Sequence, residues 1–426
     1  MDSQRPTSFE PALSGEPAPL AWARSGAMAL CGHAGAAPSA GAAAVAVWAD
    51  ALAAELCVRN ARDVPAVDGA GLLGERASIL GLRRRGRVSP GGSCRLLRAT
   101  DGFLAVQLAR PDDLDLLPAW LEREVSEAPW TALLGTLPDR PAREWVARGR
   151  LLGLAVAEAV EPAAGGGAGV RVRQIGQPRE RFRARPLVVD LSSLWAGPLC
   201  AQLLGLAGAR VVKLESTARP DGARLGPARF FDLLNAGKAS VALDLTKPRG
   251  RDRLVRLLER SDVVVEASRP RALRQLGIDA EAMLGETPGL VWVSITGYGR
   301  DEPEANWVAF GDDAAVAAGL AIAAGGVGAP IFCADAIADP LAGLAAAVAT
   351  RRALARGGGC LVDVSLSGVA REALGSVEAA PARVARRDGA WWVECDGRSE
   401  PVAPPRARRA AGRARPLGAD TAALPC

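Results

Sequence analysis

Two aspartates, Asp335 and Asp339, lie in the segment CADAIADPLAGLAAAVAT, where an Ala-rich helix is expected to begin. A carboxylate at the start of a helix is stabilised as an anion by the exposed N–H groups of the first turn, so it is a candidate nucleophile or base. The simpler interpretation is that Asp339 only caps the helix, with Pro340 as the first helical residue. The residues alone leave both roles open.

Other catalytic groups are scarce. Histidine, the usual general base, occurs once, as His33 in an Ala/Gly-rich loop, so a Ser-His-Asp or Cys-His enzyme is not expected. No carboxylate and histidine pair has the spacing of metal ligands, and we expect no metal site. The eight cysteines form no C-x-x-C pair, and no signal segment precedes them; this pattern is typical of reduced thiols in a cytoplasmic protein.

Composition narrows the class of protein further. The 426 residues are 49% hydrophobic and 4% aromatic, enough for two or three domains with sizeable cores. No apolar run reaches the ~18 residues that a membrane helix needs, so no membrane association is expected. The net charge of +5 suits an anionic ligand. Without a basic stripe interleaved with aromatic residues, nucleic acid is not an expected partner.

The elements that would position Asp339 follow a strictly alternating pattern. Leu187 to Asp190 is a short apolar run that stops at an acidic residue, as a buried parallel strand does, and Leu199 to Leu206 has helical spacing. Further strands near Arg210, Ser240, Asp262 and Leu290 alternate with helices. The fold class is therefore α/β, a doubly wound parallel sheet of Rossmann-like type, with a smaller α+β domain. No G-x-G-x-x-G follows the first strand, so it lacks a dinucleotide cradle.

Composition shifts predict five segments. They are a disordered start (1–16), a small α+β domain (17–165), a linker (166–184), the Rossmann-like domain (185–380), and a basic, Pro-rich tail (381–426) with one hairpin at Gly389 to Cys395.

The segment from Val188 to Leu366 resembles the family III CoA-transferases, the group that includes formyl-CoA transferase, carnitine CoA-transferase and α-methylacyl-CoA racemase. Several pieces carry the resemblance in order: VVDLSSLWAGPLCAQLLGLAGARVVKLE, PDGARLG, NAGKASVALDL, PGLVWVSITGYG and ADPLAGLAAAVATRRALARGGGCLVDVSL. The match is specific to the family and much less specific for a substrate.

The resemblance implies a role for Asp339. In the family the nucleophilic aspartate precedes a small residue by four positions; Asp339 with Gly343 fits, whereas Asp335 has Asp339 at that spacing. Its carboxylate would attack an acyl-CoA thioester and form an aspartyl anhydride, and CoA thiolate would return to give an aspartyl-CoA thioester for the acceptor acid. Coenzyme A and acyl-CoA are then substrates, with no permanently bound cofactor. Family members form homodimers, so a homodimer is also implied.

Four residues match the CoA-binding segments of the family: Arg224, Asn235, Lys238 and Arg269. Each alone is more simply a solvated surface residue. Together, at the carboxyl ends of strands of one sheet, they suit the phosphates of CoA.

The chain also departs from the family. Trp195 replaces a common glutamine, and the segment FGDDAAVAAGL, with Asp312 and Asp313, lacks the histidine of the racemase branch. Gly91 and Gly92 resemble the family's glycine loop over the active site, although a plain turn fits equally. The small domain, which the family places after the nucleophile, resembles residues 86 to 160 of this chain.

Three functions are therefore expected in decreasing order. The first is transfer of CoA from an acyl-CoA to a carboxylic acid. The second is an acyl-CoA racemase or isomerase on the same fold, and the third is a catalytically impaired CoA-binding protein.

Overall fold

The computed structural model describes residues 9, 11–58, 67–163, 168–180, 184–378 and 380–423. Most of the predicted disordered start, together with parts of the predicted linker, lies outside these residues.

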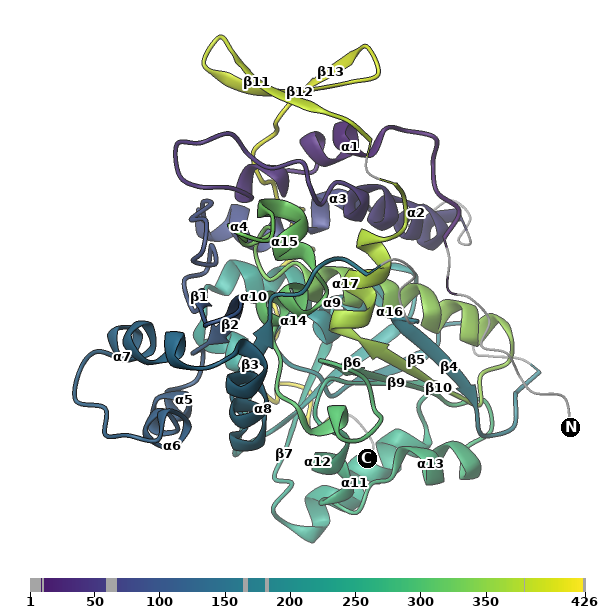
Figure 1. The fold of residues 1–426 in the computed structure, drawn as a ribbon. Helices are drawn as coiled ribbons and strands as arrows, with labels where there is room; N and C mark the ends of the chain where they lie inside the picture. The colour runs from purple at the N-terminus through teal and green to yellow at the C-terminus, as the bar shows by residue number, and fades with distance from the viewer. Residues whose placement is uncertain are drawn as a thin grey trace, which may run out of the picture.

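A seven-stranded sheet forms the centre of the molecule, in the order β4-β10-β9-β8-β5-β6-β7 (Figure 1). Six strands are parallel, and β4 pairs antiparallel with β10 at one edge. The predicted doubly wound α/β fold is therefore confirmed. The strands are β4 Val170–Gln174, β5 Leu187–Asp190, β6 Arg210–Ser216, β7 Ala239–Leu243, β8 Val263–Glu266, β9 Val291–Thr296 and β10 Cys360–Ser365.

The strand order reverses at β5, which pairs with β6 on one side and β8 on the other. The loops that follow β5 and β8 therefore lie at the topological switch point of the sheet, the crevice position at which open α/β sheets bind their ligands. The two loops also meet, because a Cβ at Gly197 would lie 3.5 Å from the Cβ of Ala267. Residues 191–195 and 267–269 thus border the crevice.

Helices cover both faces of this sheet. On one face the buried Leu254, Leu257 and Leu258 of α11 follow the helical period, and Pro248 begins that helix. On the other face α16 packs most extensively against α9. The helices are α9 Ala196–Leu206, α10 Ala228–Asn235, α11 Pro248–Glu259, α12 Pro270–Arg274, α13 Ala280–Glu286, α14 Gly311–Ala317, α15 Leu320–Gly325, α16 Ala338–Ala355 and α17 Leu366–Leu374, with single 3-10 turns at Gly222–Leu225 and Glu304–Asn306.

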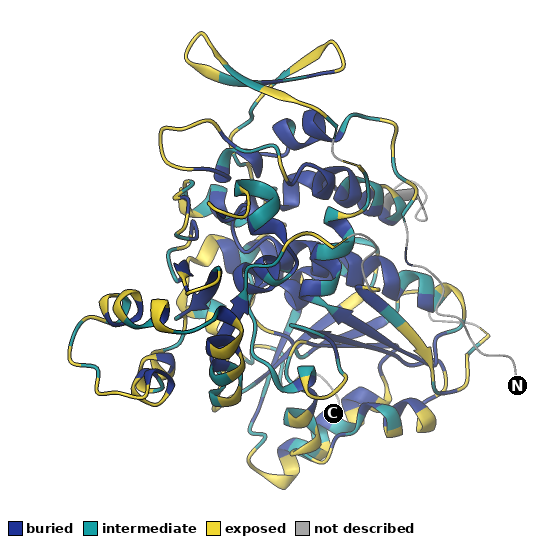
Figure 2. Ribbon diagram, in the orientation of Figure 1, coloured by how far each residue is buried: buried dark blue, intermediate teal, exposed yellow. Residues whose placement is uncertain are grey.

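The N-terminal helices form a further layer over α16, in the upper part of Figure 1. Their side chains belong to the same hydrophobic core as α9, α16 and the sheet, and Figure 2 shows this central region as buried. We had expected them within the small domain; the structure packs them on the large one. They are α1 Ala18–Arg24, a 3-10 turn Met28–Leu30, α2 Ala44–Val58, α3 Gly69–Leu72 and α4 Glu75–Leu80.

A small antiparallel sheet, β1-β2-β3, has a core of its own with the neighbouring helices. Its other face packs on α14 through residues that include Cys94, Ala157 and Val316. The strands β1 and β2 form an antiparallel hairpin around residues 99–102. The elements are β1 Cys94–Arg98, β2 Phe103–Gln107, α5 Pro111–Asp115, α6 Leu117–Leu121, α7 Pro129–Thr136, a 3-10 turn Leu137–Asp139, α8 Ala142–Leu152 and β3 Ala155–Glu158.

Two segments carry more structure than we predicted. The segment expected as a linker supplies the edge strand β4. The C-terminal region forms three strands, β11 Arg383–Arg387, β12 Ala390–Cys395 and β13 Arg398–Pro401, in place of one hairpin. Beyond them the chain docks on β7, where the Asp420 carboxylate accepts from the Ser240 N–H at 2.8 Å. An unpaired edge strand accepts such additions readily, because its backbone groups need partners.

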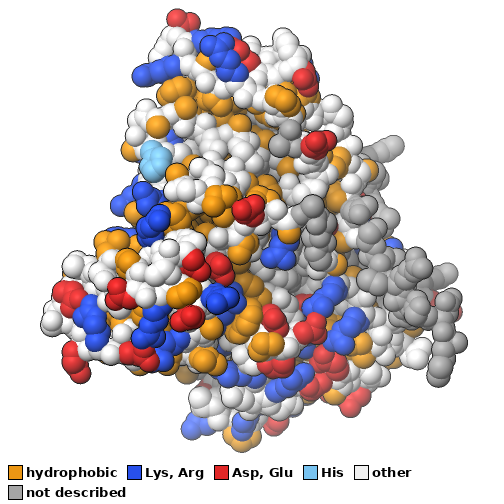
Figure 3. All heavy atoms as spheres, in the orientation of Figure 1, with side chains coloured by type: hydrophobic (Ala, Val, Ile, Leu, Met, Phe, Trp, Pro, Cys, Tyr) orange, Lys and Arg blue, Asp and Glu red, His pale blue; other side chains and the backbone are white. Residues whose placement is uncertain are grey.

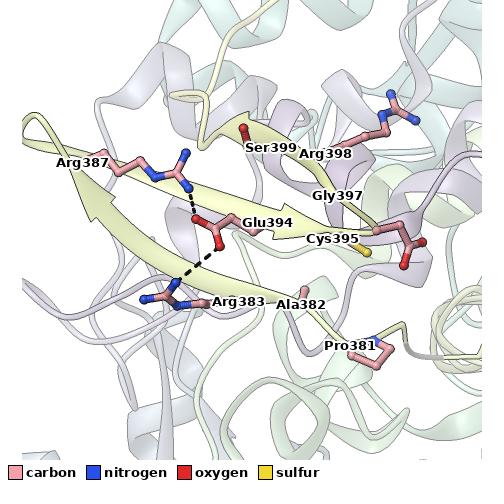
Figure 4. Close-up of a pocket in the computed structure, with 10 residues that line it drawn as sticks. Pro381, Ala382, Arg383, Arg387, Glu394, Cys395, Gly397, Arg398 and Ser399 are labelled. Atoms are coloured by element: carbon pink, nitrogen blue, oxygen red, sulfur yellow. Dashed lines mark hydrogen bonds and ion pairs between the residues drawn. The ribbon is translucent and has the colours of Figure 1, made fainter.

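The β11–β13 sheet protrudes from the body and bears an open hollow of about 640 Å³ (Figure 4). Glu394 lies at its centre, paired with Arg383 and Arg387. No side chain of the Asp339 region lines it. Among the described residues, no helix is long and apolar enough to cross a membrane.

Candidate active site

Asp339 is the second residue of α16, and the helix begins after Ile337. It is therefore not the helix cap, which removes the simpler interpretation of this residue. The chain enters the helix through Ala334 and Ala336, whose φ angles of 56° and 44° lie in the left-handed region. Alanine in this region is strained, and such strain is concentrated at functional sites, where surrounding contacts maintain it. Asp335 lies between these two residues.

Four carboxylates gather around this entry, and they differ in access. Asp312, Asp313 and Asp335 are buried, whereas Asp339 is partly exposed although it lies deep in the molecule. Gly311 lies against Asp339, and any side chain at that position would collide with the carboxylate. Asp339 is therefore the carboxylate of this group that a ligand can reach.

The electrostatics of Asp339 are unusual for an aspartate. Burial raises its pKa to about 7, and the nearby Asp312 and Asp335 add to the increase. The guanidinium of Arg76 and the backbone N–H of Gly311 oppose this change but do not cancel it. A carboxylate with a pKa near neutrality is a better nucleophile than an ordinary one when ionised, and it can also carry a proton.

Arg76, on α4, holds the neighbouring Asp335. Its Nε and Nη2 donate to the two carboxylate oxygens at 2.7 Å each, a bidentate pair. This pair joins the N-terminal layer to the strained entry of α16. The residues are 259 positions apart, so no spacing in the sequence indicated their contact.

Asp312 and Asp313 begin α14 and face this group. Asp312 accepts from the Ala336 N–H at 2.8 Å and so supports the strained entry. Burial, with Asp335, raises the pKa of Asp312 to about 6. Burial also raises the pKa of Asp313 to about 8. The Asp313 carboxylate caps its own helix by accepting from the Phe310 N–H at 2.7 Å.

Trp195 and the glycine loop complete the surroundings. The Trp195 ring is buried edge-on to Phe230, and the Arg76 guanidinium lies 5.1 Å from its centroid. Gly91 lies close to the ion pair: a Cβ there would be 3.2 Å from Arg76 Nη2 and 3.5 Å from Asp335 Oδ1. Gly91 thus lies beside this ion pair, and its role as a glycine loop over the active site stays a prediction.

Two of the predicted CoA-binding residues are engaged inside the protein. The buried Lys238 Nζ donates to Asp190 Oδ2 at 2.8 Å, to the Pro198 carbonyl at 2.9 Å and to Asn235 Oδ1 at 3.0 Å. Asn235 also donates to the Phe231 carbonyl. Three N–H groups with three partners leave none for a ligand, so Lys238 fixes the strand ends in this conformation.

Arg224 uses only some of its N–H groups for hydrogen bonds within the protein. It pairs with Glu215 through Nε and Nη2, the latter at 2.6 Å, and its guanidinium stacks on Phe231 at 4.5 Å. The remaining N–H groups of Arg224 have no partner among the described residues.

Arg269 differs from the other three, because it has no acidic partner in the described part of the chain. It follows β8 at the crevice and is partly exposed. Burial lowers its pKa, and the positive charges of Arg271, Arg110 and Arg219 lower it further. Such a cluster of cations, with Arg269 unpaired, is a candidate anion site.

The single histidine lies elsewhere. His33 is exposed, beside Gly86, and is visible in pale blue in Figure 3. Within the described ranges, no group of three or more His, Cys, Asp or Glu side chains is arranged to hold a metal ion.

Residues 186–387 match the family model described as CoA-transferase family III. Succinyl-CoA:D-citramalate CoA-transferase of Chloroflexus aurantiacus is 29% identical over 245 residues, which are 49% of this chain and 61% of the relative. Formyl-CoA:oxalate CoA-transferase of Escherichia coli is 30% identical, over 40% of this chain and 44% of that protein. Human alpha-methylacyl-CoA racemase is 41% identical over 26% of this chain and 28% of the racemase.

Among solved structures, a hypothetical protein of Mycobacterium tuberculosis is similar with a TM-score of 0.44 and 27% identity, covering 51% of this chain and 65% of the other. The chain thus spans less than two thirds of the length of these relatives. The segment matched by the family model contains β5 to β11 and therefore Asp339, but not Arg76 or the glycine loop.

Proposed function

We propose that this chain transfers CoA from an acyl-CoA thioester to a carboxylic acid, because residues 186–387 match the model of CoA-transferase family III and the chain is similar to proteins named as CoA-transferases. The observation that carries the proposal is Asp339: a partly exposed carboxylate at a strained helix entry within the matched segment, with no ion pair to any cation of the described residues. The relatives named as CoA-transferases act on different acids, so the acid used here is not fixed by similarity.

The proposed chemistry uses Asp339 twice. Its carboxylate oxygen attacks the thioester carbonyl, the C–S bond breaks, and an aspartyl anhydride and CoA thiolate result. The thiolate then attacks the aspartyl carbonyl, forms an aspartyl-CoA thioester and releases the donor's carboxylate. The acceptor carboxylate repeats these two steps in reverse order and leaves as the new acyl-CoA.

The deep position of Asp339 in the molecule favours this reaction, because it limits contact with water. Water around Asp339 is limited, so the anhydride is protected from hydrolysis, and electrostatic interactions are stronger than in bulk solvent. The Gly311 N–H, which already hydrogen bonds the carboxylate, and the glycine loop at Gly91 bring backbone groups to the place where charge develops.

We assign the phosphates of CoA to the arginines at the crevice. Arg269 is available at the end of β8, and Arg219 and Arg271 contribute positive charge nearby. Arg224 can add its unpaired N–H groups. Lys238 and Asn235 support the same strand ends through their internal hydrogen bonds. The arrangement suits a ligand with several negative charges.

The homodimer implied by resemblance stays a proposal, which sedimentation of the full chain at several concentrations would test. A single chain already brings together Asp339, Arg76 and the glycine loop.

A second function is proposed because of the similarity to the racemase. Proton exchange α to a thioester needs an acid and a base, and Asp312, Asp313 and Asp339 have pKa values of about 6, 8 and 7. Incubation of a 2-methyl-branched acyl-CoA in deuterated water distinguishes the two reactions, since deuterium at Cα is expected only from the racemase.

The transferase is tested by trapping. The full chain is incubated with a panel of acyl-CoA donors and hydroxylamine, and peptides are then examined by mass spectrometry. We expect an aspartyl hydroxamate at Asp339 and none in Asp339→Asn. Absence of modification with every donor, together with absence of CoA exchange, would contradict the proposal.

A further inference from the structure

Two hydrogen-bond donors beside Asp339 are not used by the protein. Trp195 is 2% exposed, and its indole Nε1–H has no hydrogen-bond partner among the described residues. A buried donor without a partner costs free energy comparable to a lost hydrogen bond, so its persistence calls for an explanation, such as a ligand. Arg76 is the second case, because only its Nε and Nη2 donate to Asp335. Its side chain is 27% exposed.

The two side chains are adjacent, and Arg76 pairs with Asp335 at the entry of the helix that carries Asp339. The Arg76 guanidinium lies 5.1 Å from the Trp195 ring centroid. Trp195 immediately precedes α9, and the Ala196 carbonyl approaches α16 at Gly343, one turn after Asp339, so closely that a Cβ at Gly343 would lie 2.6 Å from it. The packing of α9 on α16 therefore brings the backbone next to Trp195 close to the helix turn that follows Asp339.

We propose that Arg76 and Trp195 bind the carboxylate of the acceptor acid. This inference rests on the proposed transferase function and deepens it by assigning the acceptor site. A carboxylate only accepts hydrogen bonds, and both groups only donate them: the guanidinium has no acceptor atom, and neither has the indole N–H. A glutamine at position 195 would present an acceptor oxygen as well, so tryptophan is the more selective partner for an anion.

The charge of the site supports an acceptor that binds late. Before reaction, Arg76 faces three nearby carboxylates, Asp312, Asp335 and Asp339. Formation of the aspartyl-CoA thioester converts Asp339 into a neutral group. The attraction of Arg76 for a further anion is then less opposed, and the acceptor enters at the stage where its reaction partner is already formed.

The bound acceptor reacts with the aspartyl-CoA thioester in two steps that need no further reactant. The bound carboxylate oxygen attacks the aspartyl-CoA carbonyl, a C–O bond of the anhydride forms, and CoA leaves as the thiolate. The thiolate then attacks the acceptor's acyl carbon, forms the new C–S bond and displaces the Asp339 carboxylate. The negative charge of the bound acceptor passes to the leaving thiolate, so no proton is transferred.

The test compares two reactions in the full chain. Exchange of isotopically labelled CoA into the acyl-CoA donor requires only the first anhydride, whereas net transfer requires the acceptor. In Trp195→Phe, which keeps a ring and removes the N–H, we expect the KM for the acceptor acid to rise about tenfold, as for loss of one hydrogen bond to a charged group. CoA exchange is expected to change less than about threefold, because the bond lost is made only to the acceptor.

Arg76→Lys is the second variant, with a similar or larger rise in acceptor KM, since lysine retains the charge but not the fork of donors. Trp48→Phe is the matched control: Trp48 is a buried indole in α2 whose Nε1–H is also unpaired, and its removal should leave the acceptor KM unchanged. Capture of the aspartyl-CoA by neutral hydroxylamine should be the same in wild type and Trp195→Phe.

The outcomes separate the two proposals. If wild type shows neither CoA exchange nor transfer, the transferase function itself fails. If exchange occurs and Trp195→Phe leaves the acceptor KM unchanged, or lowers exchange and transfer equally, the acceptor site is overturned. Loss of folding in Arg76→Lys does not affect the test with Trp195→Phe.

Discussion

Two groups of buried charges lie on the same framework and have opposite character. At the ends of β5, β6 and β7, three cations face three carboxylates: Lys238 with Asp190, Lys213 with Asp221, and Arg224 with Glu215. At the entry of α16, four carboxylates gather, and among the described residues Arg76 makes the only ion pair with them. The first group is balanced, and the second carries an excess of negative charge.

The pKa shifts follow from this difference. Burial raises the pKa of Asp190, but Lys238 and Lys213 outweigh it, so the pKa is held below the ordinary value. For Asp339 the opposing charge of Arg76 does not cancel the effect of burial, and the pKa is raised to about 7. A balanced network stabilises structure, whereas an uncompensated and accessible carboxylate is kept at a cost in stability, as at active sites. The comparison supports our proposal that the first group has a structural role and the second a chemical one.

The largest expected effect is that of Asp339→Asn on activity. Removal of the nucleophile should lower transfer at least about 10³-fold, as for other covalent catalysts. The free energy of unfolding should rise, and more at pH 8 than at pH 5. The sign follows because the pKa of Asp339 is higher in the folded state than in the unfolded state, so ionisation of this group destabilises the fold. This destabilisation is absent below the unfolded-state pKa and complete above the folded-state pKa, and Asp339→Asn removes it. Activity assays and urea denaturation check both, with Asp252→Asn on the exposed side of α11 as control.

Lys238→Met tests the balanced group. It leaves Asp190 buried without its partner, so we expect a loss of about 3–5 kcal/mol in the free energy of unfolding. The double variant Asp190→Asn, Lys238→Met should recover part of this loss, because no charge remains uncompensated. Urea denaturation of the three proteins measures it. A stable Lys238→Met with a greatly raised KM for acyl-CoA would instead favour direct contact with the ligand.

The pH dependence of the first chemical step sharpens the comparison. Asp339 attacks only as the anion, so the rate of adduct formation should fall about tenfold per pH unit below its pKa of about 7. Rapid mixing with acyl-CoA between pH 5.5 and 9 gives the profile. An inflection near 4 would mean that Asp339 has an ordinary aspartate environment when substrate is bound.

Arg269→Gln should have the smallest effect. Loss of one cation from an exposed anion site is expected to raise the KM for acyl-CoA about three- to tenfold, with the difference reduced at high salt by screening. Arg383→Gln on β11 serves as the control, because Arg383 lies in the separate hollow of Figure 4. Equal KM values for wild type and Arg269→Gln at low salt would remove Arg269 from the CoA site.

Much of the large domain follows from the sequence. Buried runs such as Leu187–Asp190 and Val263–Glu266 are apolar throughout, which is the mark of parallel strands covered on both faces. The helix that carries Asp339 was expected, but its entry was not, since Ala334 and Ala336 adopt left-handed backbone that no propensity indicates. The C-terminal tail was expected to contain one hairpin, and its docking on β7 depends on a distant strand edge.

The sequence by itself determined the doubly wound sheet and the helix that carries Asp339, because these depend on local periodicity. Only the resemblance to the family implied Asp339 rather than Asp335 as the nucleophile. Only the tertiary structure decided which charges are paired. It gave Lys238 three internal partners and brought Arg76 to Asp335 from 259 residues away, while no acid of the described residues pairs with Arg269. Charge balance depends on which residues are neighbours in the folded chain, and a local sequence pattern does not show neighbours that are far apart in the sequence.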